Sequence, residues 1–366
     1  MFYLMALDKE FNMITPLYPI NVQWNRKYHE PGSFSIQLPL NQYSADIKYI
    51  YTKDRPEMGK ISQKNYAEEN GCAFMQLSGY FLENELNRHV AYPAGIMNIK
   101  NSASWIKQNR AAEDVAYAFF NGFKRITTDT FTSLLNISAS ESSGRGNKAV
   151  HTRNGEYLGV KVYDILKPSG LSYRVAYDLL DNSNMFSVWG GKDLTQENTD
   201  GNNPVVFSTK YGNLKDPNIL IDETGYKNVC INAHEEDEKY LVRALNNAAD
   251  DDTEYAFVYN ESRERKSDYT NEEGVFQEAA FLEALDDESK NKLSSCEKTF
   301  NLEFNAESGS YVYMQDFDLG DKCDIEVSGV VQMEARLIAC YEVIKAGEWS
   351  MSLEFGTPMI KKGGKH

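Results

Sequence analysis

The segment from Trp24 to Leu40, WNRKYHEPGSFSIQLPL, constrains the fold most strongly. In its second half apolar and polar residues alternate, which is the period of a strand with one buried face. Pro31 and Gly32 predict a turn before this strand, because proline presets its own φ and glycine tolerates positive φ. A β-hairpin is therefore predicted, in which the chain around Val22 and Trp24 pairs with the new strand. Its buried face is expected to carry Phe34, Ile36, Leu38 and Leu40.

Strands are predicted throughout the first 87 residues and again near the C-terminus. Short strands separated by turns indicate a small barrel or sandwich, because such folds avoid long exposed edges. Near the C-terminus, a turn at Asp318–Asp321 precedes a predicted β-meander. In these two regions, outside the first hairpin, the predicted strands are 2–7, 47–51, 72–77, 322–327, 330–344 and 349–355, with the start of another at 59–61; between the regions, strands are predicted at 205–207, 219–221 and 226–232.

Helices are predicted between these β regions. The periodicity favours helices over residues 111–123, 157–166 and 272–293, with a second hairpin over 172–190. Thr270 or Asn271 is a candidate cap for the third helix. The acidic stretch from Glu235 to Asp252 is interpreted as a solvated loop or face. In the third helix the expected buried face consists of Val275, Phe276, Ala279, Leu282 and Leu285.

Composition excludes several classes of protein. A chain of 366 residues is too long for one ordinary core, so two to four units are expected. The net charge of −16 argues against a broad basic surface that grips nucleic acid or anionic lipid, but it does not exclude a surface that nucleic acid slides past. Five cysteines without a CxxC pair indicate reduced thiols and folding in a reducing cytoplasm. No membrane span or export signal is predicted.

The motifs that carry chemistry are weak in this sequence. Ser104 and Lys107 match an SxxK pattern, but no SDN or KTG motif accompanies it, so a chance match is favoured. The loop 144–148 lacks the spacing of a phosphate-binding loop. His234 precedes three acidic residues, for which a solvated loop is favoured over a cation site. Carboxylate pairs for glycosidase chemistry depend on distances in space, so catalysis is unsupported rather than disproved.

Five segments, in this order along the chain, resemble the hub proteins at the tail tip of long-tailed bacteriophages, which are also called tail-associated or baseplate hub proteins. The resemblance covers nearly the whole chain. The segments are Trp24–Leu40, LSGYFLENELNRHV (77–90), VWGGKDLT (188–195), VVFSTKYGNL (205–214) with YKNVCIN (226–232), and FDLGDKCDIEV (317–327).

The resemblance implies an α+β, mainly β fold with two tube-like β-barrel domains, an inserted α/β domain and a smaller helical insertion. Three subunits would then present a pseudo-sixfold ring to a sixfold tail tube. The expected domains are residues 1–87 with 205–221 as the first barrel, 88–204 as the inserted α+β domain, 226–355 as the second barrel with a helical insertion at about 265–298, and 356–366 as a tail.

The expected function is that of a non-enzymatic structural hub of a phage or prophage tail tip, assembled in the bacterial host cytoplasm. No cofactor, metal or specific nucleic-acid binding is expected. The expected partners are two further copies of the chain, the distal tail or tail tube proteins, and tip fibre or receptor-binding proteins. Larger proteins of this type carry a lytic or receptor-binding extension, which partners are expected to supply here. The expected structural anchors are Trp24, Tyr28, Phe34, Ile36, Leu38, Phe317, Leu319, Gly320 and Asp321.

Two alternatives belong to other functional classes. A cell-wall-degrading tail enzyme would rest on the carboxylates and on Ser104 and Lys107. A carbohydrate-binding module would use exposed tyrosine and tryptophan side chains, although core or interface packing is the favoured use of these residues.

Overall fold

The protein is mainly β, as its computed structural model shows. The chain divides into two compact units, the first within residues 1–219 and 301–366 and the second within 220–300. The structure describes residues 3–69, 71–90, 105–127, 137–152, 156–236, 239–248, 254–262, 264–271, 273–306, 310–345 and 347–356.

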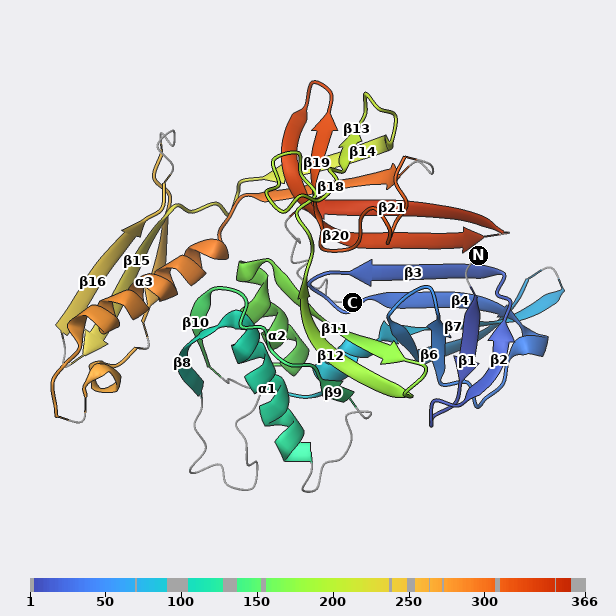
Figure 1. Cartoon of the computed structure of the whole chain (residues 1–366), viewed down its shortest axis with the longest axis horizontal. Helices are drawn as coiled ribbons and strands as arrows, with labels where there is room; N and C mark the ends of the chain where they lie inside the picture. The colour runs from blue at the N-terminus through green and yellow to red at the C-terminus, as the bar shows by residue number, and fades with distance from the viewer. Residues whose placement is uncertain are drawn as a thin grey trace. The chain divides into compact units, whose positions relative to one another are not determined.

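Thirteen strands form one large sheet (Figure 1). Its main path runs β14-β18-β21-β20-β3-β4-β7-β6-β5-β1-β2, and β19 and β13 branch from β20. None of the sheets formed by the described strands closes on itself. The strands are β1 (Leu4–Leu7), β2 (Met13–Leu17), β3 (Asn21–Lys27), β4 (Ser33–Pro39), β5 (Tyr49–Thr52), β6 (Met58–Glu69), β7 (Cys72–Phe81), β13 (Val206–Ser208), β14 (Leu214–Asp222), β18 (Thr299–Ala306), β19 (Lys322–Val327), β20 (Val331–Lys345) and β21 (Glu348–Gly356).

The predicted first hairpin lies at the centre of this sheet. β3 and β4 pair antiparallel with Trp24 opposite Phe34, which confirms the prediction. The alternation along β4 is also confirmed, since Phe34, Ile36 and Leu38 are buried. The prediction for Leu40 is wrong: this side chain is 41% exposed because a 3₁₀ turn, η1 (Leu40–Gln42), begins there and ends the strand alternation.

The hairpin also joins the two halves of the sheet. β3 pairs on its other side with β20, so the N-terminal strands continue directly into the C-terminal ones. The predicted C-terminal meander is confirmed as β19, β20 and β21. The strands between residues 205 and 222 belong to the C-terminal half by pairing: β13 pairs with β19, and β14 lies next to β18.

An α/β layer is inserted between the two halves. The predicted helices near 111–123 and 157–166 are confirmed, as is the second hairpin, in which Leu171 pairs with Gly190. Its elements are η2 (Leu82–Arg88), β8 (Trp105–Ala111), α1 (Ala112–Thr127), β9 (Ile137–Ala139), β10 (Lys148–Thr152), α2 (Leu158–Leu166), η4 (Lys167–Ser169), β11 (Leu171–Asp178) and β12 (Ser183–Gly190).

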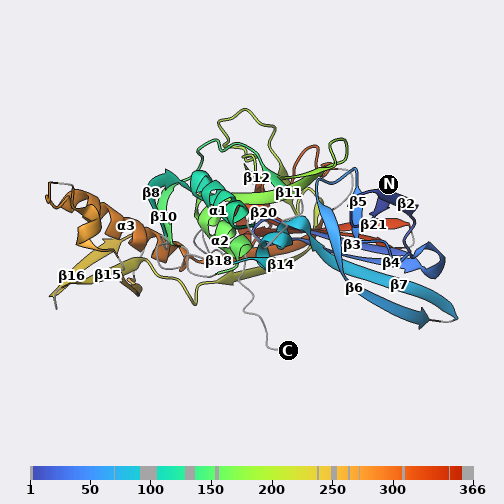
Figure 2. The same cartoon turned by 90° about the horizontal axis from the view of Figure 1, so that it is seen from below.

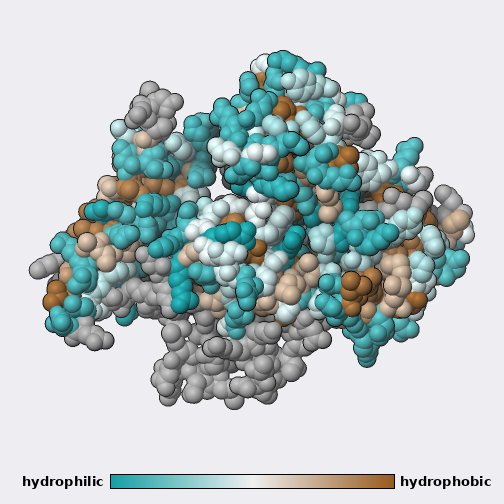
Figure 3. All heavy atoms as spheres, in the orientation of Figure 1, coloured by the Kyte–Doolittle hydropathy of each residue, from teal (hydrophilic) through white to brown (hydrophobic). Residues whose placement is uncertain are grey.

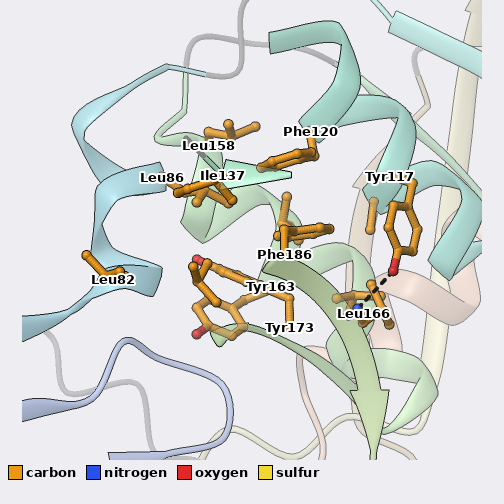
Figure 4. Close-up of a cluster of buried hydrophobic side chains, with 14 of the residues drawn as sticks. Leu82, Leu86, Tyr117, Phe120, Ile137, Leu158, Tyr163, Leu166, Tyr173 and Phe186 are labelled. Carbon is orange, nitrogen blue, oxygen red and sulfur yellow. Dashed lines mark hydrogen bonds between the residues drawn. The ribbon is translucent and has the colours of Figure 1, made fainter. Parts of the chain in front are cut away.

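The hydrophobic core of this inserted layer extends onto the N-terminal strands. Figure 4 shows Phe120 of α1 over Phe186 of β12, with ring centroids 4.3 Å apart. Tyr163 and Tyr173 lie beside them, 4.2 Å apart. The same buried cluster includes Leu7 and other residues of the first strands, so burial of apolar surface holds the inserted layer on the N-terminal half.

The second unit contains a three-stranded sheet, β16-β15-β17, and one long helix along one of its faces (Figures 1 and 2). For the acidic stretch 235–252, predicted as a solvated loop or face, most described residues lie in strands, which favours the second alternative. The predicted start of the helix at residue 272 is too early: the N-cap is Gln277, and Val275 and Phe276 precede it. Its buried face carries Phe281, Leu285, Ser289 and Leu293. The elements are β15 (Val229–Glu236), β16 (Lys239–Asn246), β17 (Phe257–Glu261), η5 (Lys266–Tyr269) and α3 (Glu278–Ser294).

Replacing Gly320 with alanine is expected to destabilise the fold more than replacing Gly329. Gly320 has a φ of +90°, and a Cβ there would lie 2.4 Å from Cε2 of Tyr28. Gly329 has a φ of +76° but no atom within 4 Å of the added Cβ, so its alanine variant carries backbone strain alone. We expect a loss of about 1 kcal/mol for G329A and at least about 2 kcal/mol more for G320A in urea unfolding. Equal losses would contradict the close packing on Tyr28.

Candidate functional site

Buried polar contacts gather where the N-terminal strands, the inserted layer and the C-terminal strands of the first unit meet. We call this region the junction. It is built from the end of β3, the segments before β6 and after β7, strand β11, and the loop before β19. Its principal residues are Arg26, Tyr28, Glu57, Glu83, Tyr313, Asp318, Gly320 and Asp321.

Arg26 is the charged centre of the junction, and it is only 1% exposed. Its Nε donates to Oε1 of Glu57 at 2.6 Å, and its Nη1 donates to Oδ1 of Asp318 at 2.8 Å and to the hydroxyl of Tyr313. Burial disfavours the guanidinium charge, but the negative charges around it outweigh that cost and raise the pKa of Arg26. The side chain therefore stays charged and ties the N-terminal half to the C-terminal half.

A second ion pair repeats this connection beside Tyr313. Arg55 donates through Nε to Oε2 of Glu342 at 2.9 Å, and Glu342 is 1% exposed on β20. The guanidinium carbons of Arg26 and Arg55 lie 5.6 and 5.5 Å from the ring centroid of Tyr313. The ring thus contacts both cations, a geometry in which its negative face attracts each of them.

Tyr28 joins the inserted layer to the same place. Its hydroxyl donates to the carbonyl of Gly170 at 2.8 Å, and its own carbonyl accepts a hydrogen bond from the Ser172 hydroxyl. Its ring meets the ring of Trp189 edge to face, with centroids 5.1 Å apart. The guanidinium carbon of Arg336 lies 5.7 Å from the centroid of the Tyr28 ring. The side chain that directly follows β3 therefore contacts both other parts of the unit.

Asp321 closes the junction on the C-terminal side. Its carboxylate accepts from the backbone N–H of Asp318 and of Lys192, each at 2.7 Å. Burial raises the pKa of this carboxyl above its ordinary value. Beside it, Gly191 approaches so closely that an added Cβ would lie 1.8 Å from the carbonyl oxygen of Gly320. The end of the inserted layer and the start of β19 are therefore in backbone contact.

Glu83 is a buried carboxyl with an unusual environment. Its Oε1 accepts from the backbone N–H of Val175 at 3.2 Å, and its Oε2 has no hydrogen-bond partner among the described residues. Burial, followed by the nearby negative charge of Glu57, raises the pKa of Glu83 to about 8. Glu83 is therefore mainly protonated at neutral pH, between η2 and β11.

The described residues that were considered for catalysis or metal binding do not form a site of that kind. Ser104 lies outside the described residues, and Lys107 belongs to β8. His234 is buried and packs on Phe281 of α3, with ring centroids 5.2 Å apart. In the described part of the chain, no group of three or more His, Cys, Asp or Glu residues is arranged to hold a metal ion. None of its helices is long and apolar enough to cross a membrane.

The expected anchors fall into three buried groups. Trp24, Phe34, Ile36 and Leu38 share one core cluster of the N-terminal strands. Tyr28, Leu319, Gly320 and Asp321 lie at the junction, where Leu319 is 2% exposed. Phe317 belongs to an aromatic group with Phe207. Their importance for stability stays a prediction.

Sequence reasoning missed the charged members of the junction. Arg26, Glu57 and Glu83 were not singled out, although one of them left a signal. Val22 and Trp24 of β3 and Tyr28, which follows the strand, are buried in alternation, and position 26 belongs to the same pattern. An arginine at a core position of a strand needs acidic partners, and this pattern alone indicates a buried ion pair.

Comparisons with known proteins relate this fold to phage tails. A protein-family model described as Siphovirus ReqiPepy6 Gp37-like protein matches residues 5–357. A search of curated proteins found no match.

Three solved structures share the fold over nearly their whole length. The prophage MuSo2 43 kDa tail protein from Shewanella oneidensis has a TM-score of 0.58 and 10% identity, over 97% of this chain and 97% of that one. The tail protein from Neisseria meningitidis MC58 has a TM-score of 0.56 and 12% identity, over 97% and 95%. Prophage tail protein gp18 from Listeria monocytogenes EGD-e has a TM-score of 0.54 and 10% identity, over 99% and 95%.

Replacing Arg26 with methionine is expected to lower the free energy of unfolding by about 3–5 kcal/mol, because Glu57 and Asp318 lose a buried positive partner. The double variant R26M/E57Q should lose less than R26M, since it removes one of the two unmatched carboxylates. Chemical denaturation of the wild type, both single variants and the double variant measures this coupling. Strictly additive losses would show that Arg26 and Glu57 do not interact.

The raised pKa of Glu83 predicts a pH-dependent stability. The unfolded chain releases this proton near the ordinary value of 4.5 and the folded chain near 8, so the unfolded state binds fewer protons between these values. The contribution of Glu83 therefore falls as pH rises through this window, by about 1.4 kcal/mol per pH unit at most.

The variant E83Q keeps a neutral side chain at every pH and should lack this loss. The difference in unfolding free energy between E83Q and the wild type, measured from pH 5 to 8, should move in favour of E83Q. A difference that stays constant over this range would contradict the protonated Glu83.

Proposed function

The chain belongs to the Siphovirus ReqiPepy6 Gp37-like family of phage tail proteins, and from this membership we propose that it is a structural hub of a phage or prophage tail tip. Three copies would form a ring that joins the tail tube or distal tail proteins to the proteins of the tip. DNA would pass through this ring during ejection. The proposed location is the tail tip of the virion, after assembly in the host cytoplasm.

The observation that carries this proposal is the division of one continuous sheet into two halves that meet at β3 and β20. Strands β1–β7 form the first half, and β13, β14 and β18–β21 form the second. If each half contributes one tube-forming domain, three subunits supply six such domains to a sixfold tube. The pairing of residues 206–222 with the C-terminal strands supports placing that segment in the second tube domain instead of the first.

The free edges of the sheet support contacts made by side chains. The strands at the two ends of its main path, β2 and β14, carry Pro16 and Pro217. Proline lacks the N–H that an added strand needs, so both edges resist strand-to-strand association. Apolar side chains are nevertheless exposed on β2, where Met13 is 54% and Ile14 is 38% exposed. Figure 3 shows apolar residues gathered over this end of the sheet, which suits a subunit contact.

The charge distribution is compatible with DNA passage. Residues 220–300 contain 21 of the 54 acidic and 9 of the 38 basic residues, a net charge of −12 out of −16. The remainder, which includes almost all of the large sheet, has a net charge of −4. A tube wall without net positive charge would gain little from counterion release on contact with DNA, so DNA would slide without adhering.

A non-enzymatic role is part of the proposal. The carboxyl groups of Glu57 and Glu83 are buried and serve the junction, and the similar structures are tail proteins by name. The cell-wall hydrolase alternative has a direct test. Clearing of purified peptidoglycan in a zymogram, lost on substitution of Ser104 or of one exposed carboxylate, would replace the structural proposal with the enzymatic one.

The purified chain is expected to form trimers. Light scattering should give a mass three times that of the 41.6 kDa chain, and negative-stain images should show rings with a central opening. The variant M13S/I14S, which makes the exposed side chains of β2 polar, should shift the mass toward the monomer. The variant L180S changes a side chain that is 94% exposed on the turn between β11 and β12 and serves as the control. A wild-type chain that stays monomeric at high concentration and forms no ring would contradict the proposal.

A further inference from the structure

The second unit differs from the rest of the chain in its charge. As counted above, residues 220–300 carry three quarters of the net negative charge in less than a quarter of the length. The unit is nevertheless folded around a small sheet with its own helix. Such a charge density keeps surfaces of the same kind apart and attracts basic ones.

The pairing registers assign the residues of this sheet to two faces. In both the antiparallel pair β15–β16 and the parallel pair β15–β17, residues opposite each other point to the same face. Cys230, Asn232 and His234 of β15 therefore share a face with Arg243 of β16, and the residues between them form the other face.

Helix α3 covers the first of these faces. The side-chain nitrogen of Asn232 donates to the carbonyl of Leu285 at 2.9 Å, and His234 packs on Phe281. Arg243 pairs with Asp286 of α3. We call this the inner face, and Figures 1 and 2 show the helix lying along it.

The opposite face, which we call the outer face, exposes large apolar side chains. Phe257 and Tyr259 of β17 are each 58% exposed, and Val242 of β16 is 59% exposed. Ile231 lies between them in the register and is partly buried. The described side chains on the outer face are Val229, Ile231, Ala233 and Glu235 of β15, Val242, Ala244 and Asn246 of β16, and Phe257, Tyr259 and Glu261 of β17.

The charged side chains in this set are both acidic. Glu235 and Glu261 lie at the same end of the outer face, on strands β15 and β17. The set contains no lysine or arginine. A second copy of the chain would bring the same carboxylates and the same net charge of −12 against this face, so self-association is opposed by repulsion.

We propose that the outer face of the second unit is the docking surface for a different tail protein, one that presents an apolar β-face or hairpin flanked by lysine or arginine. This inference rests on the proposed function, because it takes the partner from the same tail. An aromatic and aliphatic centre beside a charged edge is the composition of a specific protein interface. Phe257 and Tyr259 supply the large apolar contacts, and Glu235 and Glu261 select a basic partner.

A polysaccharide fits this face less well. Sugar binding uses aromatic rings together with several convergent polar groups, which fix the orientation of the ligand. Apart from its two carboxylates and the Tyr259 hydroxyl, the described outer face offers only Asn246 as a hydrogen-bonding side chain. Val242 and Ile231 have no hydrogen-bonding group to offer a sugar hydroxyl, whereas they match an apolar protein surface.

The test compares the free full-length chain with tails purified from the phage or prophage that encodes it. Hydroxyl-radical labelling read by mass spectrometry reports the exposure of Phe257 and Tyr259. Both should be labelled in the free chain and should lose labelling in assembled tails. Carbodiimide, which joins a carboxylate directly to a lysine amine, should link Glu235 or Glu261 to a lysine of a different tail protein.

The variant F257S/Y259S removes the centre of the outer face and leaves the inner face unchanged. It should keep the mass of the wild-type oligomer and enter tails, but the cross-link to the other protein should be lost. Tyr211→Ser is the matched control, because Tyr211 is 66% exposed in the first unit. This variant should keep the cross-link.

Three results would overturn the inference. They are labelling of Tyr259 that persists in assembled tails, cross-links only between copies of this chain, and binding of the free chain to purified cell-wall polysaccharide that depends on Tyr259. If the chain is present in tails but Tyr259 is still labelled, only this inference is contradicted. If the chain is absent from the tails, the proposed function is contradicted as well.

Discussion

The buried charge of Arg26 is the constraint on which the first unit depends. A guanidinium cannot lose its proton in a protein, so an arginine that is 1% exposed requires acidic acceptors fixed around it. Glu57 comes from the N-terminal strands, and Asp318 and Tyr313 come from the C-terminal part of the chain. Neither half satisfies Arg26 alone. The arrangement therefore favours a state in which both halves are packed together, and it disfavours a state in which one half packs without the other.

Sequence patterns predicted the local elements because their signal is itself local. The alternation through Phe34, Ile36 and Leu38 depends only on which side of a strand each residue faces, and the structure confirms it. The partners of Arg26 lie 31 and 292 residues away, and no pattern in a short window contains that distance. The predicted buried face of α3 was wrong for another reason. Val275 and Phe276 extend the helical spacing of apolar residues in the sequence, but the helix starts only after Gln277. The predicted buried face therefore included two residues that lie outside the helix.

The overall charge of the chain concealed an uneven distribution. A net charge of −16 suggested an acidic channel, yet most of that charge lies in the second unit and not in the large sheet. The acidic stretch from Glu235 to Asp252 indicates a solvated loop or the solvated face of an element, because charge runs are usually solvated. Its described part contains the end of β15 and all of β16, where apolar residues such as Val242 lie beside charged ones such as Arg243. A run of charged residues can therefore belong to a sheet as well as to a loop. The proposed tube wall and the proposed docking surface belong to differently charged parts of one chain.

Charge balance at the junction also accounts for its one neutral acid. Arg26 already faces two carboxylates, from Glu57 and Asp318, so a third ionised carboxylate nearby would have no positive partner of its own. Two conditions raise the pKa of Glu83 and favour its protonated form: the carboxyl is buried, and it is close to the negative charge of Glu57. As a neutral group it can lie between η2 and β11 at little electrostatic cost and accept the backbone N–H of Val175. Hydrophobic burial and the neutral hydrogen bond of Glu83 therefore help to hold the inserted layer, whereas the pairing of β3 with β20 and the ion pairs of Arg26 and Arg55 join the two halves of the sheet.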